Sequence, residues 1–86
     1  MNIHITNLHL NLIESDIQRM FNPYGEIQSI QLIRDKWNNR SKGNAYVVMP
    51  ADKSGRAAIL GLNNSVINGK IIRVSEVVYD PTYDRS

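Results

Sequence analysis

The spacing of the apolar residues changes repeatedly along this chain, and these changes constrain the fold more than any other feature. Residues 2–6 alternate between apolar and polar side chains, which is typical of a half-buried strand. From Glu14 the spacing becomes helical, because Ile17, Met20 and Phe21 fall at positions i, i+3 and i+4. Asn11, three residues before Glu14, is predicted to form a capping box with it.

The same two periods recur through the rest of the chain. Asn22-Pro23-Tyr24-Gly25 is predicted to end the first helix, because proline cannot continue it. The segments that follow are predicted to be a strand at 26–34, a polar loop at 35–42, a strand at 44–49, a helix at 52–62 and a strand at 70–75. The inward side chains of these segments are predicted to be Ile30, Leu32, Ala45, Val47, Met49, Ala58, Ile59, Leu62, Ile72 and Val74.

This order of elements predicts an α+β fold of the ferredoxin-like type, β-α-β-β-α-β. In it, a four-stranded antiparallel sheet carries both helices on one face. The other face of the sheet stays open to solvent, so the residues that stand on it are the candidates for function. We assign residues 1–76 to this domain and residues 77–86 to a C-terminal tail.

Composition narrows the class of protein. The 86 residues fit one domain, and 42% hydrophobic and 21% charged residues are ordinary for a globular chain. The absence of cysteine excludes disulfides, thiolate metal sites and a cysteine nucleophile. No apolar run is long enough for a membrane span, and the polar residues within the first twelve argue against a signal peptide. We therefore expect a cytoplasmic protein without membrane, metal or cofactor partners.

The net charge of +2 hides two local charges of opposite sign. Residues 34–42 carry four cations, Arg34, Lys36, Arg40 and Lys42, against Asp35, which gives 4 − 1 = +3. Residues 76–86 carry three acids against one arginine, which gives 1 − 3 = −2. A polyanion is therefore expected to approach the loop at 35–42.

The predicted open face is mixed in character. Its residues are expected to be His4, Thr6, Ser29, Gln31, Ile33, Asn44, Tyr46, Val48, Ile71, Arg73 and Ser75. The basic loop lies at the edge of this face and contains Trp37, which is expected either to fold back on the sheet edge or to stack on a base or a partner.

Two segments of the chain resemble the sequence motifs of the RNA recognition motif family. Residues 3–8, Ile-His-Ile-Thr-Asn-Leu, match the motif on that family's first strand, and residues 42–49, Lys-Gly-Asn-Ala-Tyr-Val-Val-Met, match the motif on its third strand. The resemblance covers most of residues 2–75. The compact chain looks similar to the small stand-alone bacterial members of the family.

This resemblance implies that single-stranded RNA binds across the sheet, with bases stacked on the motif aromatics. His4 and Tyr46 would each support a base, and Asn44 would reach the sugar between them. The family usually has Phe or Tyr at positions 4 and 44, so His4 and Asn44 predict weak or atypical binding. The predicted RNA-binding residues are His4, Thr6, Gln31, Trp37, Arg40, Lys42, Asn44, Tyr46 and Arg73.

Two other classes of function remain open at this point. The lack of Phe or Tyr at positions 4 and 44, together with the acidic tail, favours a protein–protein interaction module on the same fold. One version is a weak homodimer through the apolar patch Ile33, Tyr46, Val48 and Ile71. Single-stranded DNA is a further possible partner. An enzyme is not expected, and no small-molecule substrate is expected either, because the sequence has neither a glycine-rich phosphate loop nor a Ser/His/Asp set.

Overall fold

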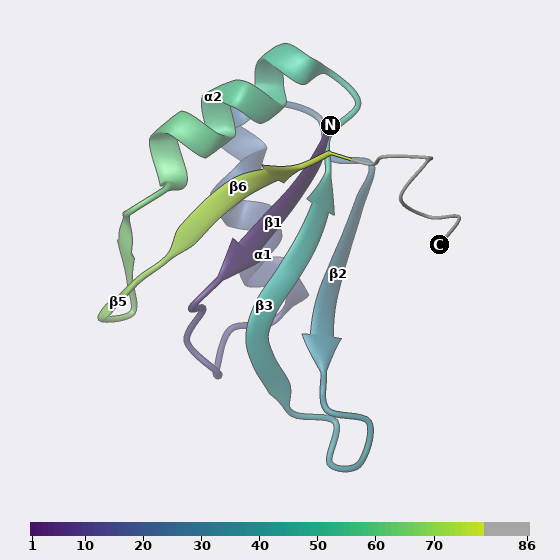
Figure 1. Ribbon diagram of the computed structural model, residues 1–86, viewed down its shortest axis with the longest axis vertical. Coiled ribbons are helices and arrows are strands. Elements are labelled where there is room, and N and C mark those ends of the chain that lie inside the picture. Colours follow the sequence, from purple (N-terminus) through teal and green to yellow (C-terminus); the bar gives the residue numbers. More distant parts are fainter. Residues whose placement is uncertain (79–86) are drawn as a thin grey trace.

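The computed structural model describes residues 1–78 and shows the predicted alternation of helices and strands (Figure 1). Its elements are β1 (Asn2–Thr6), α1 (Glu14–Phe21), the short 3-10 helix η1 (Asn22–Tyr24), β2 (Ser29–Arg34), β3 (Ser41–Val48), α2 (Asp52–Leu62), β4 (Val66–Ile67), β5 (Lys70–Ile71) and β6 (Arg73–Val77).

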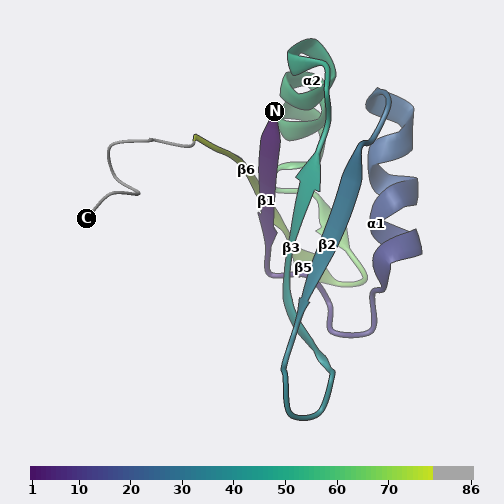
Figure 2. The same cartoon turned by 90° about the vertical axis from the view of Figure 1, so that its right-hand side faces the viewer.

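The four long strands form one antiparallel sheet in the order β2-β3-β1-β6. Both helices lie on one side of this sheet, and Figure 2 shows that none of the helices within residues 1–78 covers the other side. The predicted ferredoxin-like class is therefore confirmed. The first and third strands in the chain lie side by side at the centre of the sheet, which brings the two sequence motifs together.

The core lies between the sheet and the helices. Alternate residues of the strands point into it, and α1 contributes Ile17 and Phe21 to it. From α2 come Ala58 and Leu62, while Ile59 is only half-buried. The inward set predicted from the spacing is thus almost entirely correct, because a period-two pattern in a strand leaves few choices of face.

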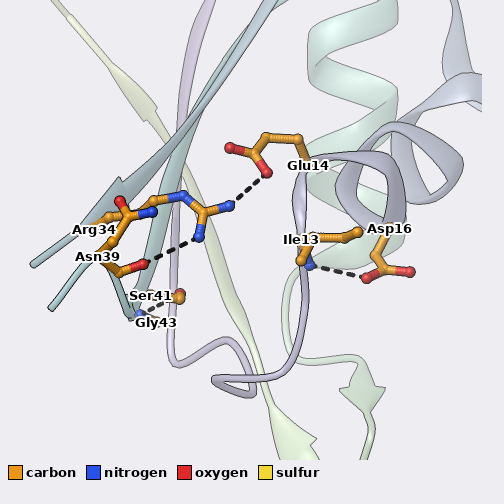
Figure 3. A network of polar contacts seen from close by, with 7 residues as sticks. All are labelled: Ile13, Glu14, Asp16, Arg34, Asn39, Ser41 and Gly43. Atoms are coloured by element: carbon orange, nitrogen blue, oxygen red, sulfur yellow. Dashed lines mark hydrogen bonds and ion pairs between the residues drawn. The ribbon is translucent and has the colours of Figure 1, made fainter.

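The start of α1 differs from the prediction. The backbone N–H of Ile13 donates a hydrogen bond of 2.9 Å to Asp16 Oδ2, so Asp16 binds the N-cap residue (Figure 3). The predicted capping box of Asn11 and Glu14 is wrong, since Asn11 lies two residues before the N-cap. Glu14 is instead free to pair with a more distant residue.

The tight connection after η1 requires glycine. Gly25 has φ of 149°, and a Cβ atom there would collide with the Ser54 side chain of α2. The end of the first helix is therefore held close to the second helix. The predicted Asn-Pro-Tyr-Gly stop is confirmed, with the added detail that it forms a 3-10 turn.

Three strands have different bounds from those predicted. β2 starts at Ser29 rather than at residue 26. β3 starts at Ser41 rather than at residue 44, because Ser41 already pairs with Arg34 of β2. The predicted strand at 70–75 is divided: Lys70–Ile71 pairs with β4, and only the part from Arg73 joins the large sheet. Ile71 therefore belongs to the small β4–β5 hairpin and not to the four-stranded sheet. β6 ends at Val77, the first residue of the assigned tail, and residues 79–86 of that tail lie outside the described residues.

Candidate nucleic-acid interface

Four predicted open-face residues form one row across the whole sheet. Gln31 of β2 pairs with Tyr46 of β3, Tyr46 pairs with His4 of β1, and His4 pairs with Ser75 of β6. Paired residues of an antiparallel sheet point to the same face. The row therefore places one amide, one phenol, one imidazole and one hydroxyl side by side at the centre of the open face.

The His4 and Tyr46 rings stack on each other at the middle of this row. Their centroids are 4.6 Å apart, and the ring planes differ by 12°. The backbone explains this closeness. On β6, the backbone N–H of Val74 points away from β1, because it donates to Asn63 Oδ1. The backbone groups of the next residue, Ser75, therefore point toward β1, where Ser75 pairs with His4. The backbone groups of His4 thus point toward β6 and not toward β3. His4 and Tyr46 are thus a non-hydrogen-bonded pair, in which side chains approach most closely.

The sequence predicts that His4 and Tyr46 each support a separate base, but in the structure the two rings stack on each other. Each ring covers part of one face of the other, so the free protein presents a two-ring unit, of which Tyr46 is 38% exposed. A planar ligand can stack on the outer faces of this unit or along its exposed edge. The sequence did not predict this contact between the two rings.

Two polar atoms beside the stack lack hydrogen-bond partners among the described residues. They are His4 Nε2 and Asn44 Oδ1, both of them buried atoms of half-buried side chains. A buried polar atom without a partner costs free energy, of the order of 1–3 kcal/mol.

The next row adds a cation at the far edge of the sheet. Thr6 of β1 pairs with exposed Arg73 of β6, and Asn44 lies beside Thr6 because Ile5 pairs with Ala45 one residue earlier. The side chains of Thr6, Asn44 and Arg73 therefore share the open face with the ring stack. The structure brings together all the predicted sheet residues of the site.

The basic hairpin, residues 35–40, extends beyond the body of the sheet in Figure 1. Its turn is held by Asp35, whose Oδ1 accepts hydrogen bonds from the backbone N–H of Trp37 (2.8 Å) and of Asn38 (3.2 Å). The Trp37 side chain is 85% exposed, and Lys36 Nζ lies 5.2 Å from its ring centroid. Of the two alternatives expected for Trp37, folding back on the sheet edge is therefore not observed, and its ring is available to a ligand.

Arg34 connects this hairpin to α1 and is not a free cation. Its Nη2 lies 2.7 Å from Glu14 Oε1, and its Nη1 donates to the carbonyl of Asn39 at 3.3 Å (Figure 3). The pKa of Glu14 is lowered, first by a hydrogen bond from its own backbone and then by Arg34. Of the cations counted in the sequence, Lys36, Arg40 and Lys42 remain exposed and outside the ion pairs of residues 1–78. The side chains of Arg40 and Lys42 are therefore exposed to a polyanion, as predicted.

The hairpin turn is expected to loosen in acid. Hydrogen bonds from Trp37 and then Asn38 lower the pKa of Asp35. A carboxylate whose pKa is lowered in the folded state stabilises that state above its unfolded pKa, and this contribution is lost as the pH falls through the folded pKa. We expect the Trp37 and Asn38 amide signals to move together below about pH 4 in a heteronuclear NMR titration. Asp35→Asn should abolish this joint step, and its persistence in that variant would contradict the assignment.

Lys36 was not among the residues predicted for the site. Its ammonium group lies over the Trp37 ring, at the same exposed tip of the hairpin. Its position directly before the tryptophan in a basic loop was the available signal.

Residues 1–78 contain no helix long and apolar enough to cross a membrane, and within that range no three His, Asp or Glu side chains are grouped as metal ligands.

Comparison with known proteins relates the chain to one family. The RNA recognition motif model matches residues 3–73. Zinc finger CCHC-type and RNA-binding motif-containing protein 1 of Xenopus laevis is 30% identical over 73 residues, which are 85% of this chain and 34% of that protein. The chloroplastic Organelle RRM domain-containing protein 1 of Oryza sativa subsp. japonica is 33% identical over 72 residues, or 84% of this chain and 18% of that protein. The chain thus spans about a third or less of the length of these relatives.

Solved structures show the same arrangement. The crystal structure of RNA binding protein PG1 superposes with a TM-score of 0.88 at 31% identity, covering 94% of this chain and 98% of that one. The Sxl-lethal protein/RNA complex superposes with a TM-score of 0.82 at 29% identity, covering 86% of this chain and 46% of that one.

Proposed function

Because the chain belongs to the RNA recognition motif family, we propose that it binds single-stranded RNA across the open face of its sheet and along the basic hairpin. The observation that carries this proposal is the His4–Tyr46 stack at the centre of the sheet face that lies opposite the helices. Aromatic rings on such a sheet are the stacking platform for bases in this class of domain. The relative that was solved as a protein/RNA complex supports RNA as the partner.

Each predicted site residue has a role in this proposal. His4 and Tyr46 stack on bases, and Trp37 at the hairpin tip stacks on a base outside the sheet. The polar side chains of Thr6, Gln31 and Asn44 offer hydrogen bonds to base edges or sugars. The cations Arg40, Lys42 and Arg73 contact phosphates, which position the strand without reading its sequence.

We propose further that this binding is modest in affinity. Asn44 cannot stack, and His4 offers a smaller ring that already contacts Tyr46. Base–aromatic stacking contributes roughly 1–3 kcal/mol per base, so the loss of one platform weakens binding by about tenfold. Single-stranded DNA should bind as well, because the stacking does not depend on the sugar.

The prediction that the chain is not an enzyme is confirmed by its membership of a non-catalytic family. The resemblance to the stand-alone bacterial proteins and the cytoplasmic location stay predictions, and so do the weak homodimer and the boundary of the tail. The alternative of a protein-interaction module receives separate support from the helix side of the molecule.

Arg40 of the hairpin and Lys42 at the start of β3 give a testable salt dependence. For single strands, each phosphate contact makes the slope of log K against log salt more negative by about 0.7. We expect the double substitution Arg40→Ala/Lys42→Ala to make the slope less negative by about 1.4, that is, twice 0.7, in fluorescence anisotropy titrations at several KCl concentrations. Arg56→Ala removes an exposed cation from the helix side and should leave the slope unchanged. Equal slopes for the double variant and the unchanged protein would exclude phosphate contacts from Arg40 and Lys42.

A further inference from the structure

An apolar groove of about 310 Å³ lies on the helix side of the molecule, away from the proposed RNA surface. It is lined by Arg56, Ile59 and Leu60 of α2 and by Glu76 of β6. Leu60 is 85% exposed, so its side chain contributes little to the core. The groove therefore presents apolar surface that folding does not use, between one cation and one anion.

The groove adjoins the outer edge of the sheet. β6 is the last strand in the order β2-β3-β1-β6, and the N–H of Val74 points away from β1 to Asn63 Oδ1, at 2.9 Å. In an antiparallel strand, residues two apart direct their backbone groups to the same side. The N–H and C=O of Glu76 therefore also point outward, next to the groove that the Glu76 side chain lines.

The first part of this edge is already occupied by the chain itself. The N–H of Ile72 donates to the carbonyl of Ser65, and the N–H of Asn64 donates to the carbonyl of Ile72, both at 2.9 Å. Asn63 then covers the N–H of Val74. Pairing of another strand can therefore begin only near Glu76, at the groove.

A second copy of the chain does not suit this edge. Symmetric antiparallel pairing centred on the open position would place Glu76 directly opposite Glu76 of the other copy, and like charges in a cross-strand pair are destabilising. A basic side chain opposite Glu76 is favourable for the same reason. The charge of the edge thus selects a different partner.

We propose that the groove and the adjacent edge of β6 bind an extended peptide segment of a second protein. The segment adds one short strand beyond β6, as in other cases of strand addition to a sheet edge. A large apolar side chain of the segment packs on Ile59 and Leu60, and a basic side chain faces Glu76. Since alternate residues of β6 point to opposite faces, RNA contacts at Arg73 remain possible while the peptide is bound.

The proposal is tested with a phage-displayed library of random twelve-residue peptides, selected on the complete folded chain. We expect enriched peptides to share a large apolar residue near a lysine or arginine. Leu60→Lys and Glu76→Lys should each weaken a selected synthetic peptide at least about tenfold, as for a central interface residue. The matched control Gln31→Lys changes the open face and should leave peptide affinity unchanged. Circular dichroism checks that each variant is folded.

Two further readouts distinguish this surface from the RNA site. A single-stranded oligonucleotide should not displace the peptide, and Glu76→Lys should bind better to a peptide whose basic residue is replaced by glutamate. The proposal is overturned if no peptide is enriched, if Leu60→Lys leaves binding intact, or if RNA competes. It is equally overturned if sedimentation shows a dimer that Leu60→Lys dissociates, because the second copy would then be the occupant.

Discussion

Replacing Tyr46 with alanine is expected to weaken the binding of single-stranded RNA by roughly 5- to 150-fold, the equivalent of 1–3 kcal/mol. Tyr46 is the six-membered ring of the central row, and its ring lies 4.6 Å from that of His4. The substitution removes the larger platform and also the support of the smaller one. Fluorescence anisotropy with a labelled oligonucleotide, at one fixed salt concentration, measures the loss.

Two variants control this experiment. Tyr46→Phe retains the ring and should bind within a few-fold of the unchanged protein. Leu60→Ala removes an equally prominent side chain from the helix side and should have no effect on RNA affinity. If Tyr46→Ala bound RNA as tightly as Tyr46→Phe, base stacking on the sheet would be excluded as the main source of affinity.

Phe21→Ala is expected to lower the free energy of unfolding by about 3–5 kcal/mol. Phe21 is fully buried at the end of α1, where it belongs to the core between helices and sheet. The whole stability of a small domain is about 5–15 kcal/mol, so this one change removes a large part of it. Urea unfolding followed by circular dichroism gives the difference.

Trp37→Ala provides the comparison for Phe21→Ala. Its ring is exposed on the hairpin, and a surface substitution of this kind should change stability by about 0.5 kcal/mol or less. A loss below about 1 kcal/mol for Phe21→Ala would contradict the core described here. The pair of aromatic substitutions therefore separates a residue that holds the fold from one that we assign to binding.

The fold could be predicted from the sequence because burial imposes a period on each element. The alternation of Ile3 with Ile5 and the helical spacing of Ile17 and Phe21 both reflect contact with one core. The small β4–β5 hairpin was missed, since its strands have two residues each. Its turn contains Asn68-Gly69, a strong hairpin signal, and both residues have positive φ.

The sequence predicted which residues belong to the open face of the sheet, but not the contacts that they make with one another. Alternation along β1 and β3 places His4 and Tyr46 on the open face, whereas their stacking depends on which cross-strand pairs are hydrogen-bonded. That pattern depends on the register between β1 and β3, which alternation along each strand does not fix. The pairing of Arg34 with Glu14 was invisible for a similar reason, because it joins residues twenty positions apart.

The most direct test of RNA binding is a heteronuclear NMR titration of the chain with single-stranded RNA at low salt. RNA on the open face predicts progressive shifts at His4, Asn44 and Tyr46, together with the hairpin amide of Arg40. Residues on the helix side, such as Leu60, should not move. Shifts confined to the helix side, or no shifts at all in the presence of excess RNA, would contradict the proposed function.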